Sequence, residues 1–309
     1  MRNFILLLLL LSVSVVRAAE VVYLDDGVEQ RHSAVKLGEH RYLYGPDDAA
    51  ERVQLVTLEW PPYISEEICG HGWVNQVVVA TLLQQGYQVE VEFMTWSHAV
   101  REAESGRAHA VFPEYFVPFS SKSDHYNARR RDLLALSVPF VGGDLSLWKN
   151  TGTHFTYSGN LYDLVAYRLG VVAGYENTPE LDLMIEDGEV RTTQVADDWR
   201  NLQMLMRGRV DFIIADKAVL RYYLFSRMSR SKARETFDKI EEVLPPLAEK
   251  ELYVAFSRHN RDAMEIRPVF DRAFRQLLRS GEFIRIRDAI SVRANEGAGC
   301  LISATQDNS

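Results

Sequence analysis

The sequence has little cysteine, and the cysteines it has lie far apart. Only Cys69 and Cys300 occur among 309 residues, and neither a Cys-x-x-Cys nor a His-Glu-x-x-His spacing is present. We therefore expect no metal site and no cofactor, because zinc centres are built on such spacings. The two cysteines either form one long-range disulfide in an oxidising compartment or stay as two thiols, and their separation leaves both readings open.

A surplus of positive charge is also absent. The chain holds 35 lysines and arginines against 43 aspartates and glutamates, a formal net charge of -8. Proteins that bind nucleic acid or anionic membrane surfaces usually carry clusters of excess positive charge. We therefore expect no nucleic-acid partner and take a small polar molecule as the expected ligand.

Long hydrophobic runs are confined to the N-terminus. Arg2 precedes an apolar run that ends at Val16, where a small-residue cleavage sequence begins. This layout is typical of a secretory signal peptide, and the run is shorter than the roughly 20 residues of a membrane-spanning helix. We expect residues 1–18 to be removed on export to the periplasm of a Gram-negative bacterium. Loss of Arg2 and Arg17 leaves 33 basic and 43 acidic residues, a net charge of -10.

The composition is that of an ordinary globular protein. With 47% hydrophobic and 25% charged residues, the chain can bury a core and is not of a disordered or fibrous type. Its length is typical of two compact lobes, since single domains usually hold about 100–200 residues. From residue 53 onward, short β-branched runs alternate with amphipathic stretches, as in strands linked by crossover helices. We predict an α/β fold.

The expected strands and helices fall into successive series along the chain. The first has strands at 53–58, 88–94 and 108–112 and helices at 74–85 and 97–105. The second has strands at 145–149, 168–173, 190–195 and 210–215 and helices from 179 and over 197–207. A strand at 251–257, a helix through 270–279 and a short helix at 283–290 follow. Thr178 and Asp197 are favoured helix caps, and residues 19–52 suggest extra turns or a hairpin.

Short motifs also recur in a distinctive order between Val53 and Ile290. They are Glu59-Trp60-Pro61-Pro62-Tyr63, Gly72-Trp73, Trp96-Ser97-His98-Ala99, residues 105–112, Leu136-Ser137-Val138-Pro139-Phe140, Leu161-Tyr162-Asp163-Leu164, residues 168–175 and residues 208–216. Each motif is weak alone, but the series resembles the extracellular solute-binding proteins of family 3, the amino-acid type with a type II periplasmic-binding fold.

The resemblance implies two α/β lobes with mixed sheets, joined by two hinge crossings and closing over a polar solute. It places lobe 1 at 19–138 and 252–309, with 19–52 as an extension, and lobe 2 at 139–251. It further implies a monomeric, non-enzymatic protein that delivers an amino acid or related compound to an ABC permease in the inner membrane. Two alternatives stay open: a ligand-sensing partner of a membrane receptor, and a dehydratase-like periplasmic enzyme on the same fold.

A cation for a ligand carboxylate comes from the same resemblance. The family places an arginine seven residues before the serine of its hinge motif, which here assigns Arg130 ahead of Ser137. Arg129 and Arg131 flank it, so any of the three arginines could face the cleft. The usual Thr-x-Glu-Arg approach is replaced here by Asn-Ala-Arg-Arg, which puts ordinary amino-acid specificity in question. The alternative is that this basic run is a solvated surface.

An anion for a ligand ammonium group is assigned to Asp216, which follows a buried-looking strand and matches the family's aspartate. Its alternative role is to cap the helix that begins at Lys217. The turn from Gly174 to Thr178 leads from a strand into a helix, where free N–H groups could receive an anion. Tyr175 and Thr178 are therefore candidates, against the alternative of a plain turn.

Aromatic side chains are the expected walls of the cleft. Trp60, Tyr63 and Trp96 lie in or beside loops after strands, where an α/β fold gathers its ligand-binding side chains. Aromatic rings can stack on a planar ligand or face a cationic group. Glu114 sits where a strand reaches the cleft mouth, and it could pair with a ligand amine or with a nearby arginine.

Overall fold

The computed structural model of the protein describes residues 19–295. The expected signal peptide, residues 1–18, and Cys300 lie outside the described residues. Cleavage on export and the disulfide between Cys69 and Cys300 therefore stay predictions.

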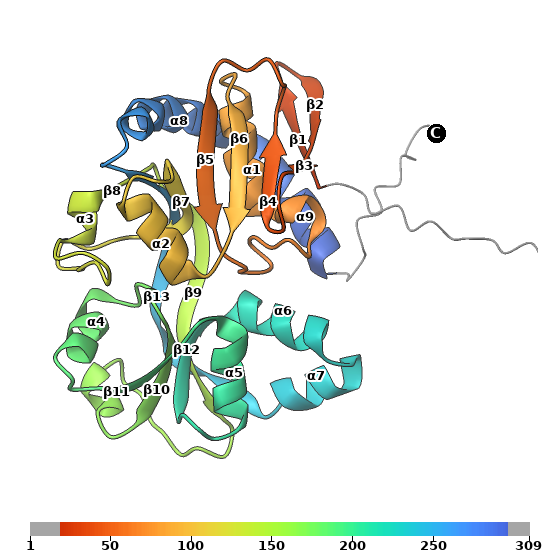
Figure 1. The fold of residues 1–309 in the computed structure, drawn as a ribbon. Coiled ribbons are helices and arrows are strands. Elements are labelled where there is room, and N and C mark those ends of the chain that lie inside the picture. Colours follow the sequence, from red (N-terminus) through yellow and green to blue (C-terminus); the bar gives the residue numbers. More distant parts are fainter. Residues whose placement is uncertain (1–18, 296–309) are drawn as a thin grey trace, which may run out of the picture.

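The described chain forms two lobes, one above the other in Figure 1. The upper lobe contains β1 (Glu20–Asp25), β2 (Val28–Ser33), β3 (Val35–Lys36), β4 (Arg41–Tyr44), β5 (Arg52–Thr57), β6 (Gln88–Phe93), β7 (Ala110–Tyr115), β8 (Leu134–Leu136), η1 (Cys69–His71), α1 (Trp73–Leu83), α2 (Trp96–Glu104), α3 (Arg130–Leu133), α8 (Arg261–Arg279) and α9 (Glu282–Asn295). The lower lobe contains β10 (Arg168–Val172), β11 (Arg191–Val195), β12 (Phe212–Asp216), η2 (Leu161–Leu164), α4 (Pro179–Glu186), α5 (Asp198–Met206), α6 (Lys217–Arg227) and α7 (Arg230–Phe237).

Two long strands connect the lobes, β9 (Phe140–Asn150) and β13 (Ile240–Ser257). They pair with each other in antiparallel orientation and run side by side through both lobes (Figure 1). Because of this pairing the strands form one sheet in the order β11-β10-β12-β9-β13-β7-β5-β6-β4-β3, with β8 also paired to β13. Strand β10 pairs in parallel with β11 and β12, and β5 pairs in parallel with β6 and β7. Strand β9 pairs with β12, and β13 with β7, in antiparallel orientation. The predicted two-lobed α/β fold with mixed strand directions is confirmed.

The lower lobe shows why its strands could be predicted from their composition. Phe212 and Ile214 of β12 join the apolar cluster on one face of the sheet, while Ile213 and Ala215 join the cluster on the other. Successive side chains of a strand point to opposite faces, so a strand covered on both sides reads as a continuous apolar run. Helices on both faces supply that cover.

The N-terminal segment covers helix α1. Strands β1 and β2 form a hairpin whose turn at Asp26 and Gly27 has positive φ angles of 48° and 79°, the backbone that hairpin turns of this length require. Gln76 of α1 accepts a hydrogen bond from Val22 N at 3.0 Å and donates one to Glu20 O at 2.6 Å. Together with α8 and α9, which also pack against α1, the hairpin leaves this helix buried along its whole length. The hairpin suggested by the sequence is confirmed.

Several element boundaries differ from those expected. Strands β9 and β13 begin at residues 140 and 240 rather than at 145 and 251, because their polar outer parts pair with each other instead of forming loops. Pro245 and Pro246 fall inside a register shift of β13, where no ladder hydrogen bond is required of them. Helix α7 was not expected, since its sequence is charged and carries few apolar residues. Thr178 and Asp197 cap α4 and α5 as predicted.

Candidate ligand-binding site

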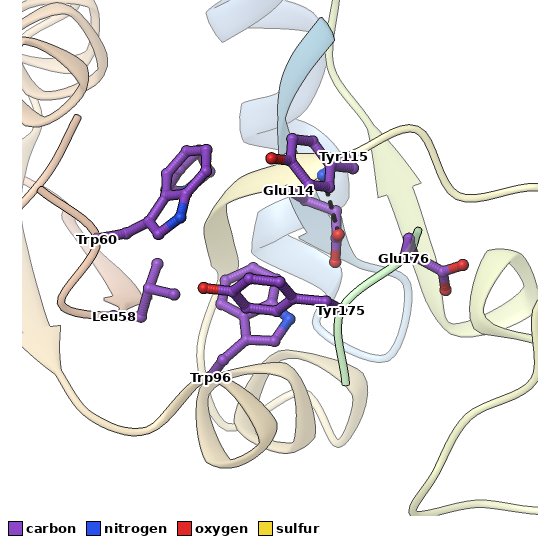
Figure 2. A pocket seen from close by; sticks show the side chains of 8 residues that line it. Leu58, Trp60, Trp96, Glu114, Tyr115, Tyr175 and Glu176 are labelled. Atoms are coloured by element: carbon purple, nitrogen blue, oxygen red, sulfur yellow. Dashed lines mark hydrogen bonds between the residues drawn. The ribbon is translucent and has the colours of Figure 1, made fainter. Parts of the chain in front are cut away.

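A small cavity with aromatic walls lies where the two lobes meet. Its empty space, which includes space open to solvent, amounts to about 270 Å³, and it is lined by Leu58, Trp60, Trp96, Pro113, Glu114, Tyr115, Tyr175 and Glu176 (Figure 2). The loop after β5, the start of α2 and strand β7 supply the upper-lobe residues, and the turn between β10 and α4 supplies the lower-lobe pair. Both lobes are therefore needed to complete the cavity.

The aromatic walls are packed against one another. The Trp60 ring stacks on Tyr63 with centroids 4.3 Å apart and meets Tyr115 edge-on at 5.8 Å. Trp96 meets Tyr175 edge-on at 6.2 Å, so this pair joins the upper lobe to the lower one. Ring faces and edges of this kind form a rigid apolar surface that can also attract a cation.

The two cavity tryptophans differ in their indole N–H groups. Trp96 Nε1 donates to Gly174 O at 3.0 Å, across the lobe boundary. Trp60 is 4% exposed, and its Nε1 has no hydrogen-bond partner among the described residues. Figure 2 shows the nitrogen edge of Trp60 turned toward the middle of the cavity. A buried donor without an acceptor is costly, so this N–H group marks a place where a ligand atom could bind.

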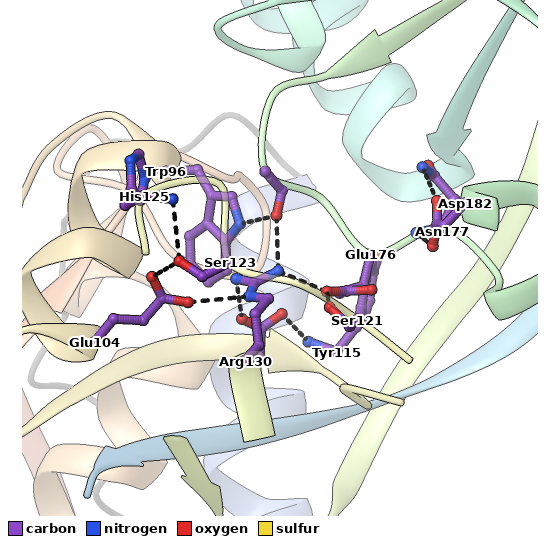
Figure 3. Close-up of polar contacts among 12 residues, drawn as sticks. Trp96, Glu104, Tyr115, Ser121, Ser123, His125, Arg130, Glu176, Asn177 and Asp182 are labelled. Carbon is purple, nitrogen blue, oxygen red and sulfur yellow. Dashed lines mark hydrogen bonds and ion pairs between the residues drawn. The ribbon is translucent and has the colours of Figure 1, made fainter. Parts of the chain in front are cut away.

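Arg130 lies beside the cavity in a buried ion-pair network (Figure 3). Its Nη2 is 3.0 Å from Glu114 Oε2, and its Nη1 is 2.8 Å from Glu176 Oε1 and donates to Gly174 O at 3.2 Å. Its Nε lies 3.6 Å from Glu104 Oε1. Glu104 and Glu114 belong to the upper lobe and Glu176 and Gly174 to the lower one. The guanidinium group therefore binds carboxylates of both lobes through its two Nη atoms and ties the lobes together, while its Nε has no hydrogen-bond partner among the described residues.

The neighbouring arginines take other positions. Arg129 is exposed and pairs with Asp132 at 2.8 Å, and Arg131 stacks over the rings of Phe119 and Phe116. Of the three arginines that the sequence left open, Arg130 is the one in the interlobe network. Its expected role toward a ligand carboxylate stays a prediction.

The network contains more negative than positive groups. Burial raises the pKa of Glu114 to about 7, although Arg130 opposes this shift, and burial also raises the pKa of Glu104. The other nearby cation is Lys250, whose Nζ donates to Glu176 O at 3.1 Å and to Asn177 O. Burial lowers the pKa of Lys250. Three carboxylates thus face one guanidinium, and the lysine is directed at backbone carbonyls.

Asp216 and Tyr63 form a second contact between the lobes. Asp216 Oδ1 accepts from Ala218 N at 2.7 Å and from Val219 N at 3.2 Å, which is the helix cap that the sequence allowed. Its Oδ2 accepts from the Tyr63 hydroxyl at 2.8 Å. Burial raises the pKa of Asp216. The side chain lies outside the cavity lining, and its role toward a ligand ammonium group stays a prediction.

Tyr175 and Thr178 have separate functions in the lower lobe. Tyr175 lines the cavity and its hydroxyl donates to Asp198 Oδ2 at 2.9 Å, while burial raises the pKa of Asp198 to about 7. Thr178 Oγ1 accepts from Leu181 N at 3.3 Å as the cap of α4, and Thr178 is not among the residues that line the cavity. A ligand contact of Thr178 stays a prediction.

The structure thus gathers Trp60, Trp96, Glu114 and Tyr175 around one cavity, as four of the eight expected ligand-binding residues. Tyr115, which lines the cavity, and Lys250, which contacts Glu176 beside it, were not among the expected ligand-binding residues, because strand residues near a hinge carry no motif. Glu104 was also missed, although a signal existed. It falls on the buried face of α2 with Ala99, Val100 and Ala103, and a carboxylate on an apolar helix face indicates a buried partner.

Two other kinds of feature were searched for within residues 19–295. No group of three or more histidine, cysteine, aspartate or glutamate side chains there could hold a metal ion. None of the helices in this part of the chain combines the length and apolar character that crossing a membrane requires.

Comparison with known proteins gives matches in structure alone. No protein-family model matches the chain, and no curated protein sequence matches it. A substrate-binding protein of an amino acid ABC transporter is similar at 16% identity and a TM-score of 0.56, covering 77% of this chain and 98% of that chain. An arginine transport-system periplasmic binding protein from Legionella pneumophila is similar at 12% identity and a TM-score of 0.58, covering 78% and 100%.

A sensor domain has the same architecture. The sensor domain of a histidine kinase, described as similar to periplasmic binding proteins, is 15% identical with a TM-score of 0.61 and covers 78% of this chain and 96% of that chain. Identities this low show the fold and not the ligand. The chain has the two-lobed fold of amino-acid-binding periplasmic proteins, and the sensor domain of this histidine kinase is similar to it as well.

Proposed function

We propose that this protein is a periplasmic binding protein that captures a small polar solute, an amino acid or a related compound, between its lobes and delivers it to an ABC importer. The observation that carries the proposal is the interlobe cavity. Its walls come from both lobes, and it contains the buried N–H group of Trp60, which has no acceptor within residues 19–295. A site completed by closing two lobes couples ligand binding to shape, which a transporter can recognise.

The proposed ligand contacts are Trp60, Trp96, Glu114 and Tyr175. Trp60 supplies a ring face and a free donor, Trp96 and Tyr175 close the cavity across the lobe boundary, and Glu114 supplies a carboxylate. Tyr63 and Asp216 would act by holding the closed state, since their hydrogen bond spans the lobes. The protein is proposed to work as a monomer without cofactor and without turnover.

A second candidate function is ligand sensing for a membrane receptor. The likeness to a histidine kinase sensor domain favours it, because the same cleft could report a solute instead of delivering it. The two functions predict different behaviour of cells that lack the protein. Loss of uptake of the solute supports delivery to an importer, whereas unchanged uptake with a lost response to the solute supports sensing.

A ligand screen tests the binding proposal directly. Residues 19–309 would be refolded to remove any carried ligand and screened by thermal shift against amino acids, amines, amino alcohols, carboxylates and osmolytes. A ligand at a hundredfold excess over its Kd adds about 2.7 kcal/mol of stability, which raises Tm by several degrees. We expect one chemical class to bind without being altered. Chemical change of the ligand would replace this proposal with the enzyme alternative.

A further inference from the structure

We propose that the cavity selects a small organic cation that carries a neutral oxygen and no carboxylate, the chemistry of an amino alcohol. The inference rests on the proposed function, since it names the solute class for the same cavity. The observation behind it is that the protein's own carboxylates already occupy the guanidinium group of Arg130.

The charge of the cavity favours a cation. Glu114 and Glu176 are the charged side chains among the residues that line it, and both are buried. Glu104 adds a third buried carboxyl group to the same network, against two cations, Arg130 and Lys250, whose Nζ lies 4.8 Å from the centre of the Tyr115 ring. A positive ligand compensates this surplus, and a negative one would increase it in a site of low dielectric.

The place that a ligand carboxylate would take is filled. Glu176 reaches Arg130 from the opposite lobe and accepts from Nη1, while Glu114 accepts from Nη2. Ser121 adds a hydrogen bond to the same Glu176 oxygen. A ligand carboxylate would have to displace Glu176 and leave it buried without its partner, which is strongly unfavourable. Glu176 therefore acts as a built-in substitute for a ligand carboxylate and excludes ordinary amino acids.

The aromatic walls of the cavity indicate which other groups the ligand carries. Trp60, Trp96, Tyr115 and Tyr175 surround the cavity with rings, which attract ammonium groups, including those without N–H donors. The free Nε1–H of Trp60 calls for an acceptor on the ligand. A hydroxyl oxygen can accept this hydrogen bond without adding negative charge. A short chain with a cationic group at one end and a hydroxyl at the other therefore matches both the aromatic rings and the Trp60 N–H group.

Two matched pairs of probes test the inference by titration calorimetry. Choline and glycine betaine share a trimethylammonium group, and ethanolamine and glycine share a primary ammonium group; within each pair a hydroxymethyl group replaces a carboxylate. We expect the amino alcohol to bind at least about tenfold more tightly in at least one pair, since a buried charge without its own partner is that costly or more. The better-binding pair also tells whether the site prefers a quaternary or a primary ammonium group.

Two substitutions separate the two ends of the ligand. Trp60→Phe keeps a ring and removes the N–H group, and should weaken the amino alcohol by about three- to tenfold. The control is Trp199→Phe, which removes an indole N–H group outside the cavity lining and should leave the affinity for the amino alcohol unchanged. Glu176→Gln frees one side of Arg130 and should improve binding of the carboxylate member of each pair.

Three results would overturn the inference. They are tighter binding of glycine betaine, glycine or arginine than of either amino alcohol, no binding of both amino alcohols at millimolar concentration, and no improved carboxylate binding in Glu176→Gln. If a ligand of another chemical class then bound in the wider screen, the proposed binding function would be kept and only the assignment to amino alcohols would be wrong. Chemical turnover of a probe would remove the proposed function itself.

Discussion

Two of the contacts between the lobes differ sharply in charge. Around Arg130, one guanidinium group meets three buried carboxylates drawn from both lobes. At Asp216, one carboxylate accepts from a single hydroxyl of the other lobe, that of Tyr63, and from two backbone N–H groups of its own helix. The first contact depends on buried ion pairs and the second on ordinary hydrogen bonds. The closed lobes are thus held by the same two groups that the family resemblance assigns to a ligand.

Removing the guanidinium should have the largest effect. Arg130→Met leaves Glu104, Glu114 and Glu176 buried without their cation, and we expect it to lower the free energy of unfolding by about 3–5 kcal/mol at neutral pH. Urea unfolding measures this loss. Arg129→Met, on the exposed neighbour, is the matched control and should leave the free energy unchanged. Equal effects of both substitutions would show that the network is not a stabilising contact.

Crowding the second contact should have a smaller effect. Gly143 lies in β9 beside the Tyr63–Asp216 pair, and a Cβ there would overlap Asp216 Oδ2 and come within 2.6 Å of Tyr63 Oη. Gly143→Ala should therefore cost about 1–3 kcal/mol and shift the lobes toward an open arrangement. Small-angle scattering detects the opening as a larger radius of gyration. Gly152→Ala, which meets no atom within 4 Å, is the control.

Removing only the Tyr63 hydroxyl tests the hydrogen bond of the second contact by itself. Tyr63→Phe keeps the ring stacked on Trp60 and leaves Asp216 with its two helix N–H donors. We expect a loss of about 1–2 kcal/mol in the free energy of unfolding, because one buried hydrogen bond to a charged group is lost. A loss as large as that of Arg130→Met would show that the two contacts are equivalent after all.

The smallest expected effect depends on pH. Burial raises the pKa of Asp198 to about 7, so the folded protein holds a proton there that the unfolded chain releases near pH 4. The stability contributed by this proton is full below pH 4, falls as the pH rises and is gone above about 7. Between pH 5 and pH 6 the wild type should therefore lose on the order of 1 kcal/mol of stability relative to Asp198→Asn, whose side chain does not ionise. A constant difference between the two at both pH values would contradict the shift.

Much of the fold could be predicted because its signals are local. Residues 212–215 form an apolar run between helices, and Thr178 and Asp197 are strong helix caps, so these elements follow from short stretches of sequence. The outer parts of β9 and β13 could not be found in this way. Their polar residues, such as Glu241 and Glu249, are typical of loops and become strand only because the other crossing lies beside them.

The site was less predictable, since its chemistry depends on distant partners. Aromatic residues after strands indicated Trp60 and Trp96, and a strand end indicated Glu114. That Arg130 is already satisfied depends on carboxylates from separate segments, with Glu176 46 positions away along the chain. Local sequence identifies the arginine, and only the folded chain shows which group it binds.

The paired crossing strands also determine how the lobes can move. Their ladder continues from one lobe into the other, with register shifts between Val243 and Ala248 and between Glu249 and Glu251. Gly142 and Gly143 lie opposite the second shift. Because glycine has no side chain, rotation of the backbone dihedral angles is less restricted there. We therefore expect the lobes to open by a twist of β9 and β13 about this point, with the hydrogen bonds between the two strands kept. In hydrogen exchange, the β9 amides on either side of the two glycines should stay protected while the lobes open and close.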